Sequence, residues 1–165
     1  MYKIRVILDA KEDVIRTILV DKTINLEELH FSIAKSFGFG RQEMASFYRT
    51  DNEWNQGEEI PLFEMEEASL DISMAGCILN ETLVHENEKL IYVYDFLKMW
   101  TFYVELIEIV DEKLETLPSI ILSVGEIPSE APEKEFIAEK NDNEENIDDL
   151  GEDFDAYEED NFTDY

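Results

Sequence analysis

The feature that most constrains the fold is an aromatic, nearly uncharged stretch near the middle of the chain, YVYDFLKMWTFYVEL at residues 92–106. Its first half alternates between two faces, as a β-strand does: Leu90, Tyr92, Tyr94 and Phe96 against Ile91, Val93 and Asp95. After a turn at residues 97–99, the run WTFYVELIEIV forms a second strand. Both strands are apolar on both faces over part of their length, which is typical of strands inside a sheet or under a helix. The stretch predicts a late aromatic β-hairpin.

The first forty residues predict another hairpin, followed by a helix. Residues 2–9 and 13–20 have the mixed pattern of strands, and the polar turn AKED lies between them. Asn25 is a good helix N-cap, and Glu28 three positions later completes a capping box. The apolar residues of the helix repeat at spacings of three and four: Leu26, Leu29, Ile33 and Phe37. Gly38 supplies its C-terminal stop.

These elements predict an α+β domain with a mixed β-sheet, a β-grasp-like ββαβ start and one main helix packed on the sheet. MASFYRTD at residues 44–51 adds a third strand, and PSIILSV at 118–124 adds a last short one. Residues 66–88 stay without an assignment, because their second half fits one or two helical turns while LDISM looks extended. We expect residues 1–135 to form the domain and residues 136–165 to form an acidic, flexible tail.

The charge of the chain restricts its partners. There are 13 basic and 41 acidic residues, which give a net charge of −28. Residues 141–165 alone contain twelve Asp or Glu and no Lys or Arg, so the rest of the chain carries −16 and is acidic in its own right. Such a surface repels phosphate backbones and anionic membranes. We therefore expect a basic protein as the partner, and neither nucleic acid nor a membrane.

The location follows from what the sequence lacks. Cys77 is the single cysteine, so an internal disulfide cannot form and a reducing compartment is the simple inference. The first residues have no continuous apolar core of a signal peptide. No apolar run approaches the roughly 20 residues that a membrane-spanning helix needs. We expect a cytoplasmic protein, and its oligomeric state is left open.

Three segments resemble the plasmid pRiA4b ORF-3-like family, an uncharacterised bacterial and archaeal group in which some members are labelled transposon-passenger recombinase-like. Residues 14–39, VIRTILVDKTINLEELHFSIAKSFGF, resemble the family's Arg-bearing strand and its Leu-His helix. LIYVYDFLKMWTFYVEL resembles its signature strand pair, Tyr-x-Tyr-Asp-Phe-Gly-Asp-x-Trp-x-His. PSIILSVGEIPSEAPE echoes its Pro-rich acidic segment. The resemblance covers most of residues 1–135 and leaves the tail outside.

The resemblance is degenerate at the polar positions. The matching signature residues are Tyr92, Tyr94, Asp95, Phe96 and Trp100. Leu97 and Lys98 stand where the family has Gly-Asp, Phe102 stands where it has His, and Glu43 replaces a further family histidine. The aromatic framework is kept while polar groups are replaced, a pattern that implies a retained fold more than a retained reaction.

Three ionisable residues are candidates for a polar or catalytic centre: Asp95, His30 and Arg16. A buried carboxylate such as Asp95 costs several kcal/mol without a partner. As a functional group it is an acid or a ligand beside His30. As a structural group it caps the turn amides of Leu97 and Lys98 or pairs with Arg16. For His30 the structural interpretation is a hydrogen bond to the sheet.

No metal site or cofactor is expected. Two histidines and one cysteine, without His-x-x-x-His or Cys-x-x-Cys spacing, argue against zinc. Cys77 has no base near it in the sequence, so a small hydrophobic filler is the favoured interpretation. FGFG lacks the lysine and hydroxyl that a phosphate-binding loop needs.

The tail places aromatic residues among its carboxylates: Phe154, Tyr157, Phe162 and Tyr165. Such a pattern can dock into a basic, grooved partner, and the alternative is a disordered solubilising tail. We expect the whole chain to be a non-enzymatic protein-interaction module. Two alternatives are kept: an enzyme or nucleic-acid-processing accessory of a mobile element, centred on Asp95, His30 and Arg16, and a DNA-mimic protein.

Overall fold

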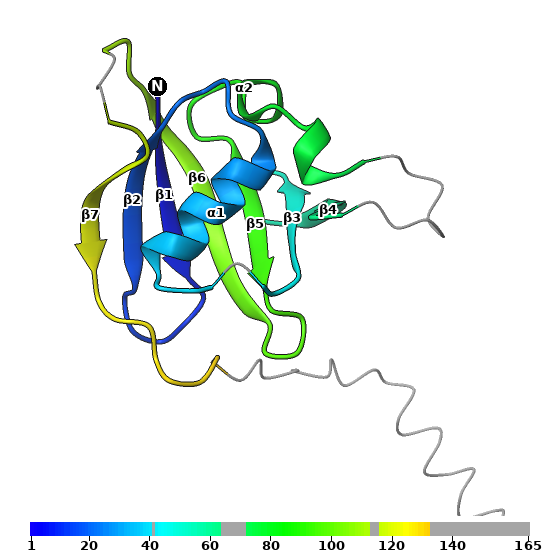
Figure 1. Cartoon of the computed structure of the whole chain (residues 1–165), viewed down its shortest axis with the longest axis vertical. Coiled ribbons are helices and arrows are strands. Elements are labelled where there is room, and N and C mark those ends of the chain that lie inside the picture. The colour runs from blue at the N-terminus through cyan, green and yellow to red at the C-terminus, as the bar shows by residue number, and fades with distance from the viewer. Residues whose placement is uncertain (41, 64–71, 113–115, 133–165) are drawn as a thin grey trace, which may run out of the picture. The chain divides into compact units, whose positions relative to one another are not determined.

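The computed structural model describes residues 1–40, 42–63, 72–112 and 116–132. These residues form a seven-stranded sheet, with one helix lying across it (Figure 1). The strands are β1 (Tyr2–Leu8), β2 (Ile15–Val20), β3 (Ala45–Thr50), β4 (Gln56–Pro61), β5 (Lys89–Tyr94), β6 (Trp100–Ile109) and β7 (Ser119–Val124). Their order across the sheet is β4-β3-β5-β6-β1-β2-β7. The predicted domain boundary and the predicted tail lie outside the described residues.

The expectation of a mixed sheet is wrong, because all six pairings between these strands are antiparallel. The short loops between β1 and β2, β3 and β4, and β5 and β6 allow only this direction, since parallel neighbours need a crossover of a dozen or more residues. The β-grasp-like start is not confirmed either. The strand that follows the helix, β3, pairs with β4 and β5 and not with the opening hairpin.

The two hairpins predicted from the sequence are both present. In β1 buried residues alternate with half-buried ones along the whole strand, as the alternating sequence predicts. In the aromatic hairpin, Tyr92 of β5 faces Phe102 of β6 and Tyr94 faces Trp100. All residues of β5 after Lys89 are buried, because β5 lies between β3 and β6 in the middle of the sheet.

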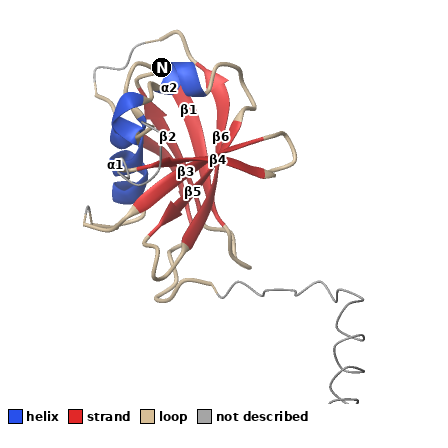
Figure 2. Cartoon of the chain, turned by 90° about the vertical axis from the view of Figure 1, so that its right-hand side faces the viewer, coloured by secondary structure: helices blue, strands red, loops and turns tan. Residues whose placement is uncertain are grey.

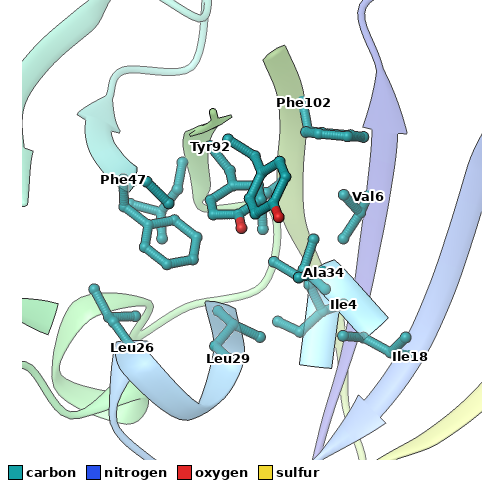
Figure 3. Close-up of a cluster of buried hydrophobic side chains, with 14 of the residues drawn as sticks. Ile4, Val6, Ile18, Leu26, Leu29, Ala34, Phe47, Tyr92 and Phe102 are labelled. Carbon is teal, nitrogen blue, oxygen red and sulfur yellow. The ribbon is translucent and has the colours of Figure 1, made fainter. Parts of the chain in front are cut away.

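Helix α1 (Leu26–Ser36) begins at the capping box that the sequence predicts: the Glu28 amide donates to the Asn25 side chain and the Asn25 amide donates to the Glu28 carboxylate. Its C-cap is Phe37, and the next residue, Gly38, has a positive φ of 79°. Figure 2 shows α1 against one face of the sheet. Figure 3 shows the core that this packing encloses, where Leu29 and Ala34 of α1 lie on the same side as Ile4 of β1.

Two short helical pieces lie in the region that the sequence left open. A 3₁₀ turn, η1 (Met74–Gly76), is followed by the single-turn helix α2 (Leu79–Thr82). Leu79 and Leu83 are buried, whereas Val84 is exposed. The described residues contain no helix that is long and apolar enough to cross a membrane.

Strand β4 was not predicted. Its residues QGEEIP are exposed except near the end. Their sequence suggests a polar turn, because an edge strand with charged side chains lacks the apolar alternation of a core strand.

Candidate functional site

Arg16 lies on β2 and holds three segments of backbone together. Its Nε atom donates to the carbonyl oxygen of Ser36 at the end of α1, at 2.9 Å. Its Nη1 atom donates to the carbonyl oxygens of Val124 and Gly125, both at 3.0 Å, and to that of Ile15 at 2.9 Å. The guanidinium also lies over the ring of Phe37, 4.9 Å from its centroid. Burial lowers the pKa of Arg16 from its ordinary value. Arg16 therefore joins β2, the end of α1 and β7.

His30 lies on the sheet-facing side of α1 and is fully buried. Its Nδ1 atom is 2.5 Å from the hydroxyl oxygen of Tyr92 on β5, which is the hydrogen bond to the sheet that the sequence suggested. Its Nε2 atom has no hydrogen-bond partner among the described residues. Burial lowers the pKa of His30 to about 4 and raises the pKa of Tyr92 well above its usual value. At neutral pH both side chains are uncharged.

Asp95 begins the turn of the aromatic hairpin. One of its carboxylate oxygens accepts from the amides of Leu97 at 3.1 Å and Lys98 at 3.4 Å. Asp95 itself has a positive φ of 60°, a conformation that Asp and Asn tolerate better than most residues. The turn is closed further by the Met99 amide, which donates to the Asp95 carbonyl at 2.6 Å. The predicted turn-capping interpretation of Asp95 is confirmed, while Arg16 bonds elsewhere.

The three candidates do not form one polar centre. In the part of the chain that the structure describes, no hydrogen bond or ion pair joins any two of Arg16, His30 and Asp95. An open hollow of about 220 Å³ exists elsewhere, between the ends of β3 and β5 and α2. Its cations are held by carboxylates: Lys89 lies 3.6 Å from Glu105, and Arg49 lies 3.4 Å from Glu58.

The signature aromatic residues fill the interior. Tyr92, Tyr94 and Trp100 are buried, and Phe96 is half-buried. Phe39, from the loop after α1, stacks on Tyr94 with ring centroids 4.5 Å apart and also contacts Trp100. The Tyr94 hydroxyl donates to the carbonyl oxygen of Gly40 at 2.7 Å. These rings are held by core packing and backbone contacts and do not line the hollow.

The described residues offer no group of three or more His, Cys, Asp or Glu side chains placed to hold a metal ion. Cys77 is half-buried against the core, and burial raises the pKa of its thiol. A thiol whose pKa is raised is a weak nucleophile at neutral pH. The partner-binding residues predicted in the tail, Phe154, Tyr157, Phe162 and Tyr165, lie outside the described residues.

Sequence reasoning missed the surface of β7. The strand itself was predicted, but four of its six residues are exposed large hydrophobic side chains: Ile120, Ile121, Leu122 and Val124. Its sequence SIILSV reads as a core strand, because an apolar run does not show whether a strand lies in the middle or at the edge of a sheet. The one available signal was the absence of charge over six residues in a strongly acidic chain.

Comparisons with known proteins give a family and a fold. The family model described as "Plasmid pRiA4b ORF-3-like protein" matches residues 1–161. The match therefore extends well beyond residue 135, where the resemblance was expected to end. No curated protein matches the sequence. The crystal structure of the protein of unknown function MM3350 from Methanosarcina mazei Go1 is similar, with a TM-score of 0.62 and 19% sequence identity over 74% of this chain and 68% of that chain.

Proposed function

This chain belongs to the plasmid pRiA4b ORF-3-like protein family, and from that premise we propose that it is a non-enzymatic, cytoplasmic interaction module that binds a basic protein. The proposal rests on the hydrogen bonds that the three candidate polar side chains make. Arg16 is bonded to backbone carbonyls, His30 to Tyr92 and Asp95 to turn amides. Each of these side chains already makes a hydrogen bond within the fold, which supports a structural role over a catalytic one.

Charge supports the choice of partner. The chain carries −28, and four of the basic residues that the structure describes are paired with carboxylates: Lys3 with Glu108, Arg5 and Lys89 with Glu105, and Arg49 with Glu58. Because each of these cations lies beside a carboxylate, they form no basic patch, and the excess of 41 acidic over 13 basic residues leaves the chain strongly negative. A field of this sign speeds the encounter with a basic partner and opposes binding to phosphate. The tail aromatic residues Phe154, Tyr157, Phe162 and Tyr165 are proposed to add contacts.

The test is affinity capture with the full-length chain from a lysate of its source organism, followed by titration with the purified partner. We expect a basic protein whose affinity falls when salt rises from about 50 mM to about 300 mM, because screening weakens attraction between opposite charges. A matched variant replaces the four tail aromatics by serine and leaves every charge in place. If this variant binds the partner more weakly, the tail aromatic residues contribute to the contact. If it binds equally well, they do not.

The same experiment separates the two alternatives. A DNA mimic captures a DNA-binding protein that duplex DNA displaces competitively. An accessory enzyme centred on Asp95, His30 and Arg16 requires a conversion that His30→Gln abolishes in a chain that still folds. Capture of no partner by the full-length chain at either salt concentration would overturn the proposal of an interaction module.

A further inference from the structure

The two edges of the sheet are built differently. At one edge β4 carries Glu58, Glu59 and Pro61, which are the residue types that prevent an edge strand from pairing with another chain. At the other edge β7 has no charged residue and no proline between Ser119 and Val124. β7 therefore lacks the charges and the proline that protect β4, although its register with β2 shifts between Thr17 and Ile18, as at a β-bulge.

The side chains of β7 are open to solvent. Ile120 is 52% exposed, Ile121 and Leu122 are each 47% exposed, and Val124 is 39% exposed. These four residues lie within a run of five positions. The other exposed large hydrophobic residues in the described ranges lie singly in loops or at strand ends: Phe63, Val84, Leu97, Met99 and Ile109. Among the described residues β7 pairs with β2 alone, so the backbone groups of its outer side have no strand beside them. An exposed apolar edge of this kind accepts an added strand.

The edge is held in place for such pairing. Arg16 bonds the carbonyl oxygens of Val124 and Gly125 at the end of β7. Gly125 has a φ of +72°, and a Cβ atom at this position would lie 2.2 Å from the carbonyl oxygen of Asp13, so the backbone packs closely there. A fixed strand loses little conformational entropy when a partner strand is added.

Acidic residues lie at one end of this apolar strand. At its C-terminal end the exposed Glu126 follows Gly125, and Gly125 contacts Asp13 in the loop between β1 and β2. Residues 9–13 of that loop hold three carboxylates and one lysine. At the other end Ser119 faces Leu19, and the exposed Asp21 and Lys22 follow β2, so their charges cancel there. The edge is thus an uncharged strand whose Gly125 end is acidic.

We propose that the outer edge of β7 binds an extended, β-branched apolar segment of a partner protein, flanked by Lys or Arg, which adds to the sheet as an eighth strand. The inference rests on the proposed function and names the surface and the partner segment for it. Backbone hydrogen bonds and apolar contacts would hold the added strand, and its basic flank at the Gly125 end would meet Glu126 and Asp13. A second copy of this chain fits less well, because it brings another −28 to the interface.

The test uses the full-length chain and three synthetic ten-residue peptides. The first is rich in Val, Ile and Thr with two Lys at each end, the second has Glu in place of Lys, and the third has the Lys flanks with a central proline, which prevents strand pairing. We expect the first peptide to bind and to slow hydrogen exchange at β7 amides. The Glu-flanked and proline-interrupted peptides should each bind at least about ten-fold more weakly.

Variants locate the binding on the chain. Leu122→Lys and Ile121→Lys place a charge on the edge and should each weaken binding of the first peptide at least about ten-fold. Leu97→Lys is the matched control: Leu97 is 97% exposed on the turn of the aromatic hairpin, so the same substitution there should leave binding unchanged. Circular dichroism and unfolding midpoints verify that each variant folds, and the two edge variants are independent of each other.

Several results would overturn the proposal. Among these are equal binding of the proline-interrupted peptide, an equal effect of Leu97→Lys, and failure of the Lys-flanked peptide to bind. Sedimentation showing a dimer that Leu122→Lys dissociates would assign the edge to a second copy. Slow exchange of all β7 amides in the free monomer would assign it to another segment of the same chain.

The inference and the proposed function can fail separately. A captured basic partner that binds the wild-type chain and Leu122→Lys equally leaves the interaction module standing and removes β7 from it. Conversely, the peptide experiment tests the β7 edge even when no natural partner is captured.

Discussion

The Nδ1 atom of His30 lies 2.5 Å from the hydroxyl oxygen of Tyr92, so one buried hydrogen bond joins helix α1 to the centre of the sheet. The two residues are 62 positions apart in the sequence. Tyr92 is completely buried among Phe47, Phe102 and other core residues (Figure 3). A buried hydroxyl without a partner costs about 1–3 kcal/mol. His30 supplies that partner, and this explains a histidine on the core-facing side of a helix.

The pH dependence of stability follows from this pair. His30 has a pKa of about 4 in the folded chain, against 6.5 ordinarily. Well above its ordinary pKa of 6.5, the imidazole is neutral in both states and has no effect. As the pH falls from 6.5 to 4 the unfolded chain takes up a proton that the folded chain refuses, so stability decreases. The full loss is about 3 kcal/mol, from about 2.5 pKa units at 1.36 kcal/mol each.

This dependence is measured by denaturant unfolding of the wild-type chain and His30→Gln at pH 7, 6 and 5. Glutamine can still hydrogen-bond to Tyr92 but does not titrate. Carboxylates titrate equally in both proteins, so the difference between the two stability profiles isolates the histidine. Parallel profiles between pH 7 and 5 would contradict the buried, neutral state of His30.

Replacing Arg16 by methionine should destabilise the chain by about 2–4 kcal/mol. Methionine keeps part of the packing against Phe37, but it leaves the carbonyl oxygens of Ser36 and Val124 without their donor. Arg49→Met is the matched control. Arg49 is an exposed residue that pairs with Glu58 at 3.4 Å, so its loss should cost less than about 1 kcal/mol. Equal free energies of unfolding for the two variants would contradict the anchoring of β7 by Arg16.

Two substitutions at Asp95 separate the effect of its hydrogen-bond acceptor on stability from the effect of its negative charge. Asp95→Asn keeps an oxygen that accepts from the Leu97 amide, and asparagine also tolerates a φ of 60°. We expect this variant to lose less than about 1 kcal/mol of stability and Asp95→Ala to lose about 1–3 kcal/mol. Chemical denaturation measures both. If the two variants were equally unstable, the negative charge of Asp95 and not its turn-capping oxygen would be the important property.

Two glycines provide a matched pair for the packing of the edge strand. Gly125→Ala should destabilise the chain by several kcal/mol, because the new Cβ would lie 2.2 Å from the Asp13 carbonyl oxygen at a positive φ. Gly40→Ala has no atom within 4 Å of the new Cβ and should change stability by less than about 1 kcal/mol. Thermal unfolding compares them. A neutral Gly125→Ala would show that the end of β7 is free to move away from β2.

Local elements were predictable because their causes lie within a few residues. The capping box of α1 needs only Asn25 and Glu28, and the turn cap of Asp95 needs only the next three residues. Each hairpin follows from two alternating segments joined by a short loop. Strand β4 was missed for the opposite reason: its charged residues, such as Glu58, make it a tolerable edge but hide its strand pattern.

The candidate site was predicted only in its separate parts. The hydrogen bond of His30 to the sheet and the turn-capping role of Asp95 were both considered from the sequence, and both are present. The partners of Arg16 were not predictable, because its carbonyl acceptors are as far as 109 positions away. Neither was the pairing of β1 with β6 or of β2 with β7, which depends on how distant segments are placed beside each other.

The sequence by itself determined the residues of every strand except β4, where the long helix begins and ends, and how strongly acidic the chain is. These properties follow from short-range hydrogen bonding, side-chain periodicity and composition. Only the tertiary structure decided that β4 and β7 are the two edges, that Arg16 anchors β7, and that the apolar residues of β7 face solvent. An apolar strand is buried or exposed according to its neighbours, and neighbours are chosen by the packing of the whole domain.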